Sequence, residues 1–331
     1  MAVPFPRSID ERRLRSTKRL EALTQEVEKI DGLSNLRGIC IYATGSYGRF
    51  EASDQSDLDL FLIDAGSDND ALGRVAGLEL LAGLVRCCRH QGFPEFSNDG
   101  EFLTVHRLDH IIGELGSPKD DYYNYFTARL LLLLESAVVS NSTAYNAAID
   151  KLVGTYFRDY HDHEKAFEPV FFVNDIIRFW RTLCLNYEHS RSRRGTGAPI
   201  DPLVRAKAHL KNLKLKFSRM LICYSMIVGM LASEARSQDD VVRLVHFRPL
   251  ERLQDACQRR PSLEAKVGSL FDLYAWFLDW TGRPANIVLS DISRQSERDE
   301  VFAKARAFAV AMSEIVLEAA PNKEKLRYIV L

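Results

Sequence analysis

The sequence lacks a charge excess of either sign. Its 331 residues include 44 Lys and Arg against 45 Asp and Glu, which gives a formal net charge of −1. A strongly basic chain is drawn to nucleic acid phosphates over a long range, and this balance excludes a global attraction of that kind while leaving a local basic groove open. Hydrophobic residues make up 46% and charged residues 27%, a composition typical of a folded globular protein rather than a disordered one.

Cysteines at the spacing of metal ligands and long apolar runs are also missing. The six cysteines show no metal-ligand pairing, and a reducing cytoplasm fits their use best. The N-terminal segment carries charges between Arg7 and Arg13 and has no apolar stretch of the signal-peptide type. The apolar run Leu130–Leu134 is too short to span a membrane. We therefore expect a cytoplasmic protein with no membrane partner.

The most informative stretch begins with a buried strand. Gly38–Thr44 is mostly apolar, Gly45-Ser46 breaks it, and a short helix is expected from Tyr47. An apolar strand follows, in which Asp57 and Asp59 are one residue apart. Because successive side chains on a strand alternate between its faces, both carboxylates should point one way and the intervening leucines into a core.

These residue types indicate a particular chemistry. Two neighbouring carboxylates repel each other unless a cation lies between them, and oxygen ligands favour Mg²⁺, with Mn²⁺ as an alternative. Glycine lets the backbone approach a phosphate closely, and the Ser46 hydroxyl offers one more donor. Separately, Gly45-Ser46 is typical of an ordinary strand-to-helix turn and Asp57-Leu58-Asp59 of a solvated strand face. Their combination, twelve positions apart, favours metal-assisted phosphoryl or nucleotidyl transfer.

The segments Gly45–Glu51 and Ser56–Leu60 resemble the nucleotidyltransferase motif of the DNA polymerase β-like superfamily. They are most similar to the branch that contains the PII-protein uridylyltransferases and related nucleotidyltransferases. The resemblance implies that Asp57 and Asp59 are catalytic metal ligands and that Gly45-Ser46 contacts the phosphates of a nucleoside triphosphate (NTP). The chain is too short to contain the sensory domains of the full uridylyltransferases.

Two further features match that branch. Arg49 lies in the first segment, where it could contact phosphate or form a salt bridge with Glu51 or Asp54 that shapes the loop. The segment Tyr125–Ser136 resembles the helix that follows the catalytic sheet in that branch.

Enzymes of this superfamily usually carry a third acid on a neighbouring strand, as a general base or a further metal ligand. The leading candidate for this catalytic residue is Glu101, in the predicted strand Glu101–His106. Asp99 is the second candidate and Glu95 the third, and none of them has a diagnostic spacing.

The expected fold class is α+β, with two parts after an N-terminal helix. Residues 1–29 form that helix, residues 30–115 a polymerase β-like catalytic domain with a mixed sheet, and residues 116–331 an α-helical bundle. Strand patterns nearly disappear from about residue 119, and helical periodicity replaces them. Breaks in the bundle are expected near residues 194–202, 248–249, 261 and 282–284.

The helical half contains a basic cluster. Lys207, Lys211 and Lys214 recur at helical spacing and share one face. Lys207 and Lys211 are candidates for binding the triphosphate tail or the acceptor, including an RNA end. A solvated basic helix face explains the same pattern.

The sequence therefore predicts a metal-dependent nucleotidyltransferase. It would transfer an NMP group from an NTP such as ATP to a protein, a tRNA or other RNA, or a small molecule, with release of pyrophosphate. The alternative is a nucleotide-binding or interaction module of the same fold with weak or no turnover. The base of the NTP, the acceptor and the oligomeric state stay open.

Overall fold

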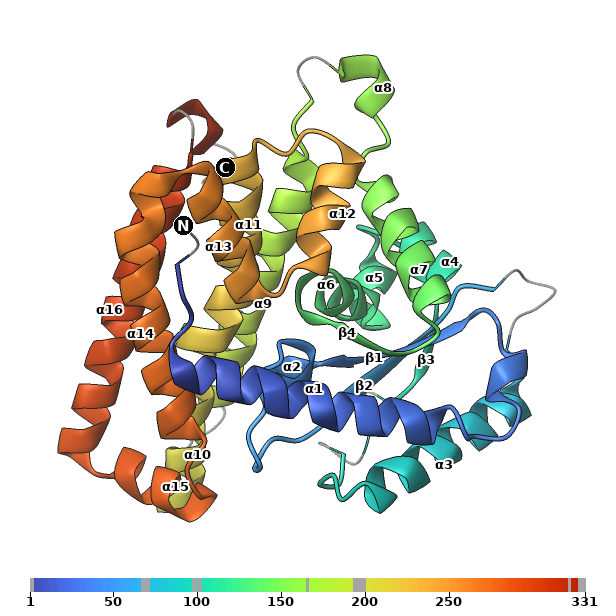
Figure 1. The fold of residues 1–331 in the computed structure, drawn as a ribbon, viewed down its shortest axis with the longest axis horizontal. Helices are drawn as coiled ribbons and strands as arrows, with labels where there is room; N and C mark the ends of the chain where they lie inside the picture. The colour runs from blue at the N-terminus through green and yellow to red at the C-terminus, as the bar shows by residue number, and fades with distance from the viewer. Residues whose placement is uncertain are drawn as a thin grey trace. The chain divides into compact units, whose positions relative to one another are not determined.

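A computed structural model of the protein describes residues 3–66, 72–96, 100, 103–164, 167–192, 201–320 and 323–326. The chain divides into two compact units. We call Asp10–Lys165 the sheet unit, and Met1–Ile9 together with Ala166–Leu331 the helical unit. The α+β class is confirmed, because one small mixed sheet accompanies many helices (Figure 1).

The elements of the sheet unit alternate between helices and short strands. They are α1 (Arg7–Val27, which begins in the helical unit), η1 (Leu33–Asn35), β1 (Ile39–Thr44), α2 (Gly45–Gly48), β2 (Asp59–Asp64), α3 (Arg74–His90), β3 (Val105–Arg107), α4 (Leu108–Gly113), α5 (Pro118–Tyr122), α6 (Tyr125–Glu135), β4 (Ala137–Ser140), α7 (Ser142–Thr155) and α8 (Tyr160–His163).

The four strands lie in the order β3-β2-β1-β4. β1 pairs antiparallel with β2 and β4, and β2 pairs parallel with β3. The register of the central pair joins Thr44 to Asp59 and Ile39 to Asp64. The last residue of β1 and the first residue of β2 are therefore neighbours, which places the turn after β1 beside the start of β2.

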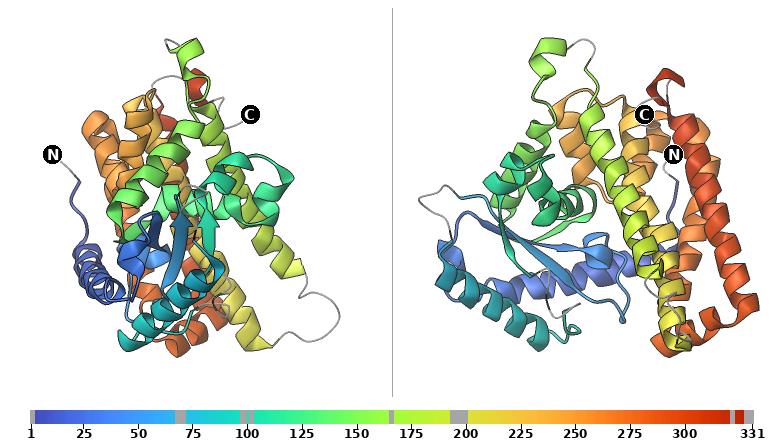
Figure 2. Two further views of the ribbon diagram at one scale, coloured as in Figure 1. Left: turned by 90° about the vertical axis from the view of Figure 1, so that its right-hand side faces the viewer. Right: turned by 180° about the vertical axis from the view of Figure 1, so that it is seen from behind.

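Helices cover both faces of this sheet (Figures 1 and 2). On one face, Ile41 and Leu60 belong to a buried apolar cluster with Leu23 of α1 and Leu84 of α3. On the other face, aromatic rings of the strands meet a helix: Tyr42 stacks on Phe61 with ring centroids 5.9 Å apart and lies 6.2 Å from Tyr145 of α7. β1 is buried along its whole length, as predicted for Gly38–Thr44.

The sheet unit extends past the boundary expected at residue 115. β4 adds a fourth strand against β1, although the sequence indicated almost no strands beyond residue 119. Helix α6 is tied to α5 by a fully buried pair in which Arg129 donates to both carboxylate oxygens of Asp120, at 2.8 and 2.9 Å. Because these elements pack on the sheet or on one another, the compact unit continues to Lys165.

The helical unit is a bundle. Its elements are α9 (Val170–Ser192), α10 (Pro202–Lys214), η4 (Leu215–Arg219, a π-helical turn), α11 (Met220–Ser233), α12 (Gln238–His246), α13 (Pro249–Arg259), η5 (Pro261–Leu263), α14 (Glu264–Thr281), α15 (Ala285–Ser293), α16 (Gln295–Ala319) and η6 (Lys323–Leu326). The breaks predicted near residues 248–249, 261 and 282–284 are confirmed as helix boundaries.

Helix α11 forms the centre of this bundle, in contact with α9, α12, α13 and α16. Among the described residues, the helical stretch 202–233 is long and apolar enough to cross a membrane, but 78% of its most apolar window is buried inside the protein. Core helices of globular proteins share this composition, and the burial of α11 accounts for its hydrophobicity here.

Candidate active site

The turn after β1 is held against β2 by the strand register. Gly45 follows Thr44 directly and adopts a left-handed backbone with φ of +64°. The short helix α2 begins at Gly45 rather than at the expected Tyr47. A β-carbon at Gly45 would lie 3.3 Å from Oδ2 of Asp59, so the glycine backbone and this carboxylate are close neighbours. The structure thus brings together the predicted phosphate-binding turn and one predicted metal ligand.

The two aspartates differ in their surroundings. Asp59 is half-buried and opens β2, whereas Asp57 is exposed and lies before the strand begins. Leu58 between them is 1% exposed, as is Leu60, so the predicted burial of these leucines is confirmed. The prediction that one strand carries both aspartates is wrong, because β2 begins at Asp59.

The rest of the turn is anchored by packing. Ser46 is half-buried, which leaves part of its surface accessible, while the Tyr47 ring is buried edge-on against Phe93 at 5.4 Å. The backbone N–H of Glu51 donates to the Ser46 carbonyl at 2.8 Å and closes the loop. The position of Ser46 is therefore set by a main-chain hydrogen bond and by the aromatic anchor next to it.

Gly48 is a closely packed position of the turn, which the sequence did not reveal. A β-carbon there would lie 2.1 Å from the Glu135 carbonyl oxygen and 2.8 Å from that of Ala43, closer than side chains are tolerated. The end of α6 therefore packs directly on the turn. The second glycine of the Gly-Ser-Tyr-Gly segment could have indicated this close packing. Its partner, the end of α6, is far away in the sequence and could not be identified from it.

The sequence left two roles open for Arg49, a phosphate contact or a salt bridge that shapes the loop. The structure shows the salt bridge. The Arg49 guanidinium is buried, donates to Glu51 at 2.7 Å, and also pairs with Glu135 at the end of α6. The Glu51 carbonyl in turn accepts from Arg12 of α1 at 3.0 Å. A phosphate contact by Arg49 would compete with these carboxylates, so the geometry favours a positioning role over the predicted nucleotide contact.

The third acid falls largely outside the described residues. Glu101 and Asp99 both lie there. Glu95 is described, but it is exposed and accepts from two guanidinium nitrogens of Arg89 at 2.9 Å, in a segment that belongs to no strand. This pairing lowers the pKa of Glu95, first through the hydrogen bond from Arg89, and so disfavours Glu95 as a general base.

The carboxylate groups of the two predicted aspartate ligands near the turn are of the kind that binds a divalent cation. Carboxylate oxygens of Asp57 and Asp59 are the hard ligands that Mg²⁺ prefers, and the left-handed Gly45 leaves open space beside Asp59 that a side chain would narrow. Within the described part of the chain, no group of three or more His, Cys, Asp or Glu side chains is arranged to hold a metal ion. The acidic side chains that the described turn offers are therefore Asp59 beside Gly45 and Asp57, two residues before Asp59 in the sequence.

The predicted lysines lie on the other unit. Lys207, Lys211 and Lys214 are exposed on α10, while Ala206 and Leu213 of the same helix are buried. The predicted shared, solvent-accessible face is confirmed. Which ligand these lysines contact stays a prediction.

No protein-family model matches the chain, and a search of curated proteins finds no relative for it. A functional assignment therefore rests on the geometry of the turn and the two aspartates.

Proposed function

We propose that the protein is a metal-dependent nucleotidyltransferase with a polymerase β-like catalytic domain. One observation carries the proposal: the Thr44–Asp59 register sets the Gly45-Ser46 turn against the Asp59 carboxylate. A site for this reaction needs a place where phosphate oxygens approach the backbone and a carboxylate within a few ångströms of them. The mixed sheet with helices on both faces supports the fold assignment.

Each residue has a defined role in this proposal. Asp57 and Asp59 would hold Mg²⁺ or Mn²⁺, which when bound neutralises phosphate charge and aligns the nucleophile with the leaving pyrophosphate. Gly45 allows the NTP phosphates to approach the backbone, and Ser46 donates a hydrogen bond from its hydroxyl. Glu101 is the proposed base that accepts the proton of the attacking hydroxyl. Arg49 positions the turn through Glu51 and Glu135.

The acceptor is a protein side chain, the 3′ end of a tRNA or other RNA, or a small molecule. ATP is the first NTP to test, since the base is not fixed by the turn. Lys207 and Lys211 are proposed contacts for the triphosphate tail or an RNA acceptor. Cytoplasmic location belongs to the same proposal.

The experiment is a transfer assay with a matched control. Purified protein is incubated with each labelled NTP, Mg²⁺ or Mn²⁺, and a lysate that offers protein and RNA acceptors. We expect one NTP to label an acceptor, with the signal reduced at least about 100-fold in Asp57→Asn/Asp59→Asn, because the charge that holds the metal is removed. The control Asp31→Asn/Asp54→Asn removes two exposed carboxylates of the same unit and should keep the signal. Equal labelling by both variants contradicts the proposal.

The second candidate is a nucleotide-binding module without turnover. It needs only the turn and its neighbouring aspartates, since binding without turnover requires no general base. The same assay separates the candidates when NTP binding is measured alongside transfer. Tight, metal-dependent NTP binding with no transfer to any acceptor identifies the module, whereas transfer that is lost in Glu101→Gln while NTP binding is kept identifies the enzyme and its third acid.

A further inference from the structure

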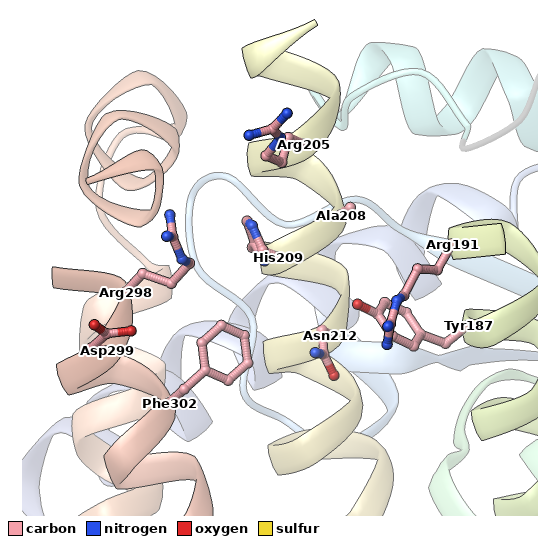
Figure 3. A pocket seen from close by; sticks show the side chains of 9 residues that line it. All are labelled: Tyr187, Arg191, Arg205, Ala208, His209, Asn212, Arg298, Asp299 and Phe302. Atoms are coloured by element: carbon pink, nitrogen blue, oxygen red, sulfur yellow. The ribbon is translucent and has the colours of Figure 1, made fainter. Parts of the chain in front are cut away.

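A cavity of about 380 Å³ lies in the helical unit between α9, α10 and α16 (Figure 3). Its volume falls in the range of roughly 300–1,000 Å³ that is typical of small-molecule sites. The main lining side chains come in three pairs with a spacing of four residues, and each pair therefore shares one helix face. The pairs are Tyr187 and Arg191 on α9, Arg205 and His209 on α10, and Arg298 and Phe302 on α16.

The positive charge of this cavity is only weakly compensated. Arg298 is held by the carbonyls of Ile292 and Ser293 and by the side-chain oxygen of Gln295, all of them uncharged. The Arg205 guanidinium makes no hydrogen bond or ion pair with any described residue, and it is exposed. Asp299 is the one acidic residue that lines the cavity within the described chain, and the Gln295 amide donates to both of its oxygens. A third lining arginine, Arg191, pairs with Glu188 at 3.2 Å. Arg205 and Arg298, which have no acidic partner among the described residues, thus face one lining acid that already has a partner.

The pKa of His209 reflects this positive charge. Burial, then the nearby Arg298 and Arg205, lower the pKa of its imidazole, so both guanidinium groups lie close enough to disfavour a further positive charge. Figure 3 shows Arg298 reaching from α16 toward His209 and Arg205 of α10. The same three residues also line an adjoining cavity of about 270 Å³, so the basic cluster borders a continuous stretch of recessed surface.

Aromatic rings complete the site. Phe302 is half-buried and meets the His209 ring edge-on, with centroids 6.2 Å apart, and Tyr187 is half-buried on the opposite helix. Guanidinium groups bind phosphate with paired hydrogen bonds, and aromatic faces stack on nucleobases. A ligand that combines a phosphate with a planar ring uses both features of the cavity.

We propose that this cavity binds a nucleotide, with its phosphate at Arg205 and Arg298 and its base against Phe302 or Tyr187. All of the lining residues belong to the helical unit, so the proposal goes beyond the turn at Asp59 and does not depend on metal binding there.

The test is calorimetric titration of Asp57→Asn/Asp59→Asn with ATP and AMP in the presence of EDTA, so that the metal-dependent site is silent. We expect one site per chain, weakened at least about tenfold when Arg205→Gln/Arg298→Gln is added, because charge-assisted hydrogen bonds to phosphate are lost. The matched control Arg236→Gln/Arg259→Gln removes two arginines of the same unit that do not line the cavity. It should leave binding unchanged.

Separate probes test the two halves of the ligand. Adenosine and inorganic phosphate should each bind more weakly than AMP, and either Phe302→Leu or Tyr187→Leu should weaken AMP but not phosphate. If the double variant unfolds, Arg205→Gln alone replaces it in the titration. This single substitution removes no hydrogen bond or ion pair to a described residue. Equal binding by the Arg205→Gln variant and its parent, or no nucleotide binding without metal, overturns the proposal. Either result leaves the transfer assay for the Asp57 and Asp59 site unaffected.

Discussion

Gly45 and Asp59 are in such close contact that a β-carbon on the glycine would lie 3.3 Å from the Oδ2 of the aspartate. Gly45 directly follows Thr44, the last residue of β1, and the antiparallel register pairs Thr44 with Asp59, the first residue of β2. Space for a ligand beside the Asp59 carboxylate therefore depends on residue 45 being a glycine, which has no side chain. This relationship gives the first prediction.

Gly45→Ala should impair NTP use more than stability. Its left-handed backbone disfavours alanine by about 1–2 kcal/mol, and the new methyl group presses on Asp59. Gly92→Ala is the matched control, because Gly92 has a similar φ of +69° and nothing within 4 Å of its β-carbon. We expect similar losses of unfolding free energy in urea for both variants, and lower NTP transfer for Gly45→Ala alone. Equal transfer by the two variants would argue against a ligand at this turn.

Arg49→Met should destabilise the sheet unit strongly. The substitution leaves the Glu51 and Glu135 carboxylates buried without this cation, and breaking a buried ion pair typically costs about 3–5 kcal/mol. Arg15→Met, which breaks the exposed pair with Asp54, should cost at most about 1 kcal/mol. Urea midpoints measure both. A stable Arg49→Met protein with lost activity would instead indicate a direct phosphate contact.

The pH dependence of stability should include a contribution from His106. Burial lowers the pKa of this imidazole below its usual 6.5, beside the Phe61 and Tyr125 rings. The unfolded chain therefore binds a proton more readily just below pH 6.5, so this contribution is present above that pH and is lost as the pH falls. We expect His106→Gln to flatten the decline in unfolding free energy between about pH 6.5 and 5.

The control for this experiment is His161→Gln, which replaces an exposed histidine of the same unit. Its pH profile should match that of the unchanged protein. An unaltered slope in His106→Gln would show that this half-buried imidazole does not contribute.

The core of the site was predictable from the sequence because its signals are local. The apolar run that forms β1, the break at Gly45-Ser46 and the alternation around Asp57 and Asp59 all lie within one short segment. β4 was missed because its four residues become a strand through pairing with β1, nearly a hundred residues earlier. The Glu135 partner of Arg49 and the close packing on Gly48 were hidden for the same reason: both depend on where α6 ends in space.

Nucleotidyl transfer at the Gly45-Ser46 turn and the two aspartates is best tested by comparing two labels. NTP labelled on the α-phosphate and NTP labelled on the γ-phosphate are each incubated with the protein, Mg²⁺ and an acceptor. We predict that only the α-label reaches the acceptor, with release of pyrophosphate, and that Asp57→Asn/Asp59→Asn abolishes the transfer. Labelling from the γ-phosphate, or α-label transfer that persists in this variant, would contradict the proposed reaction.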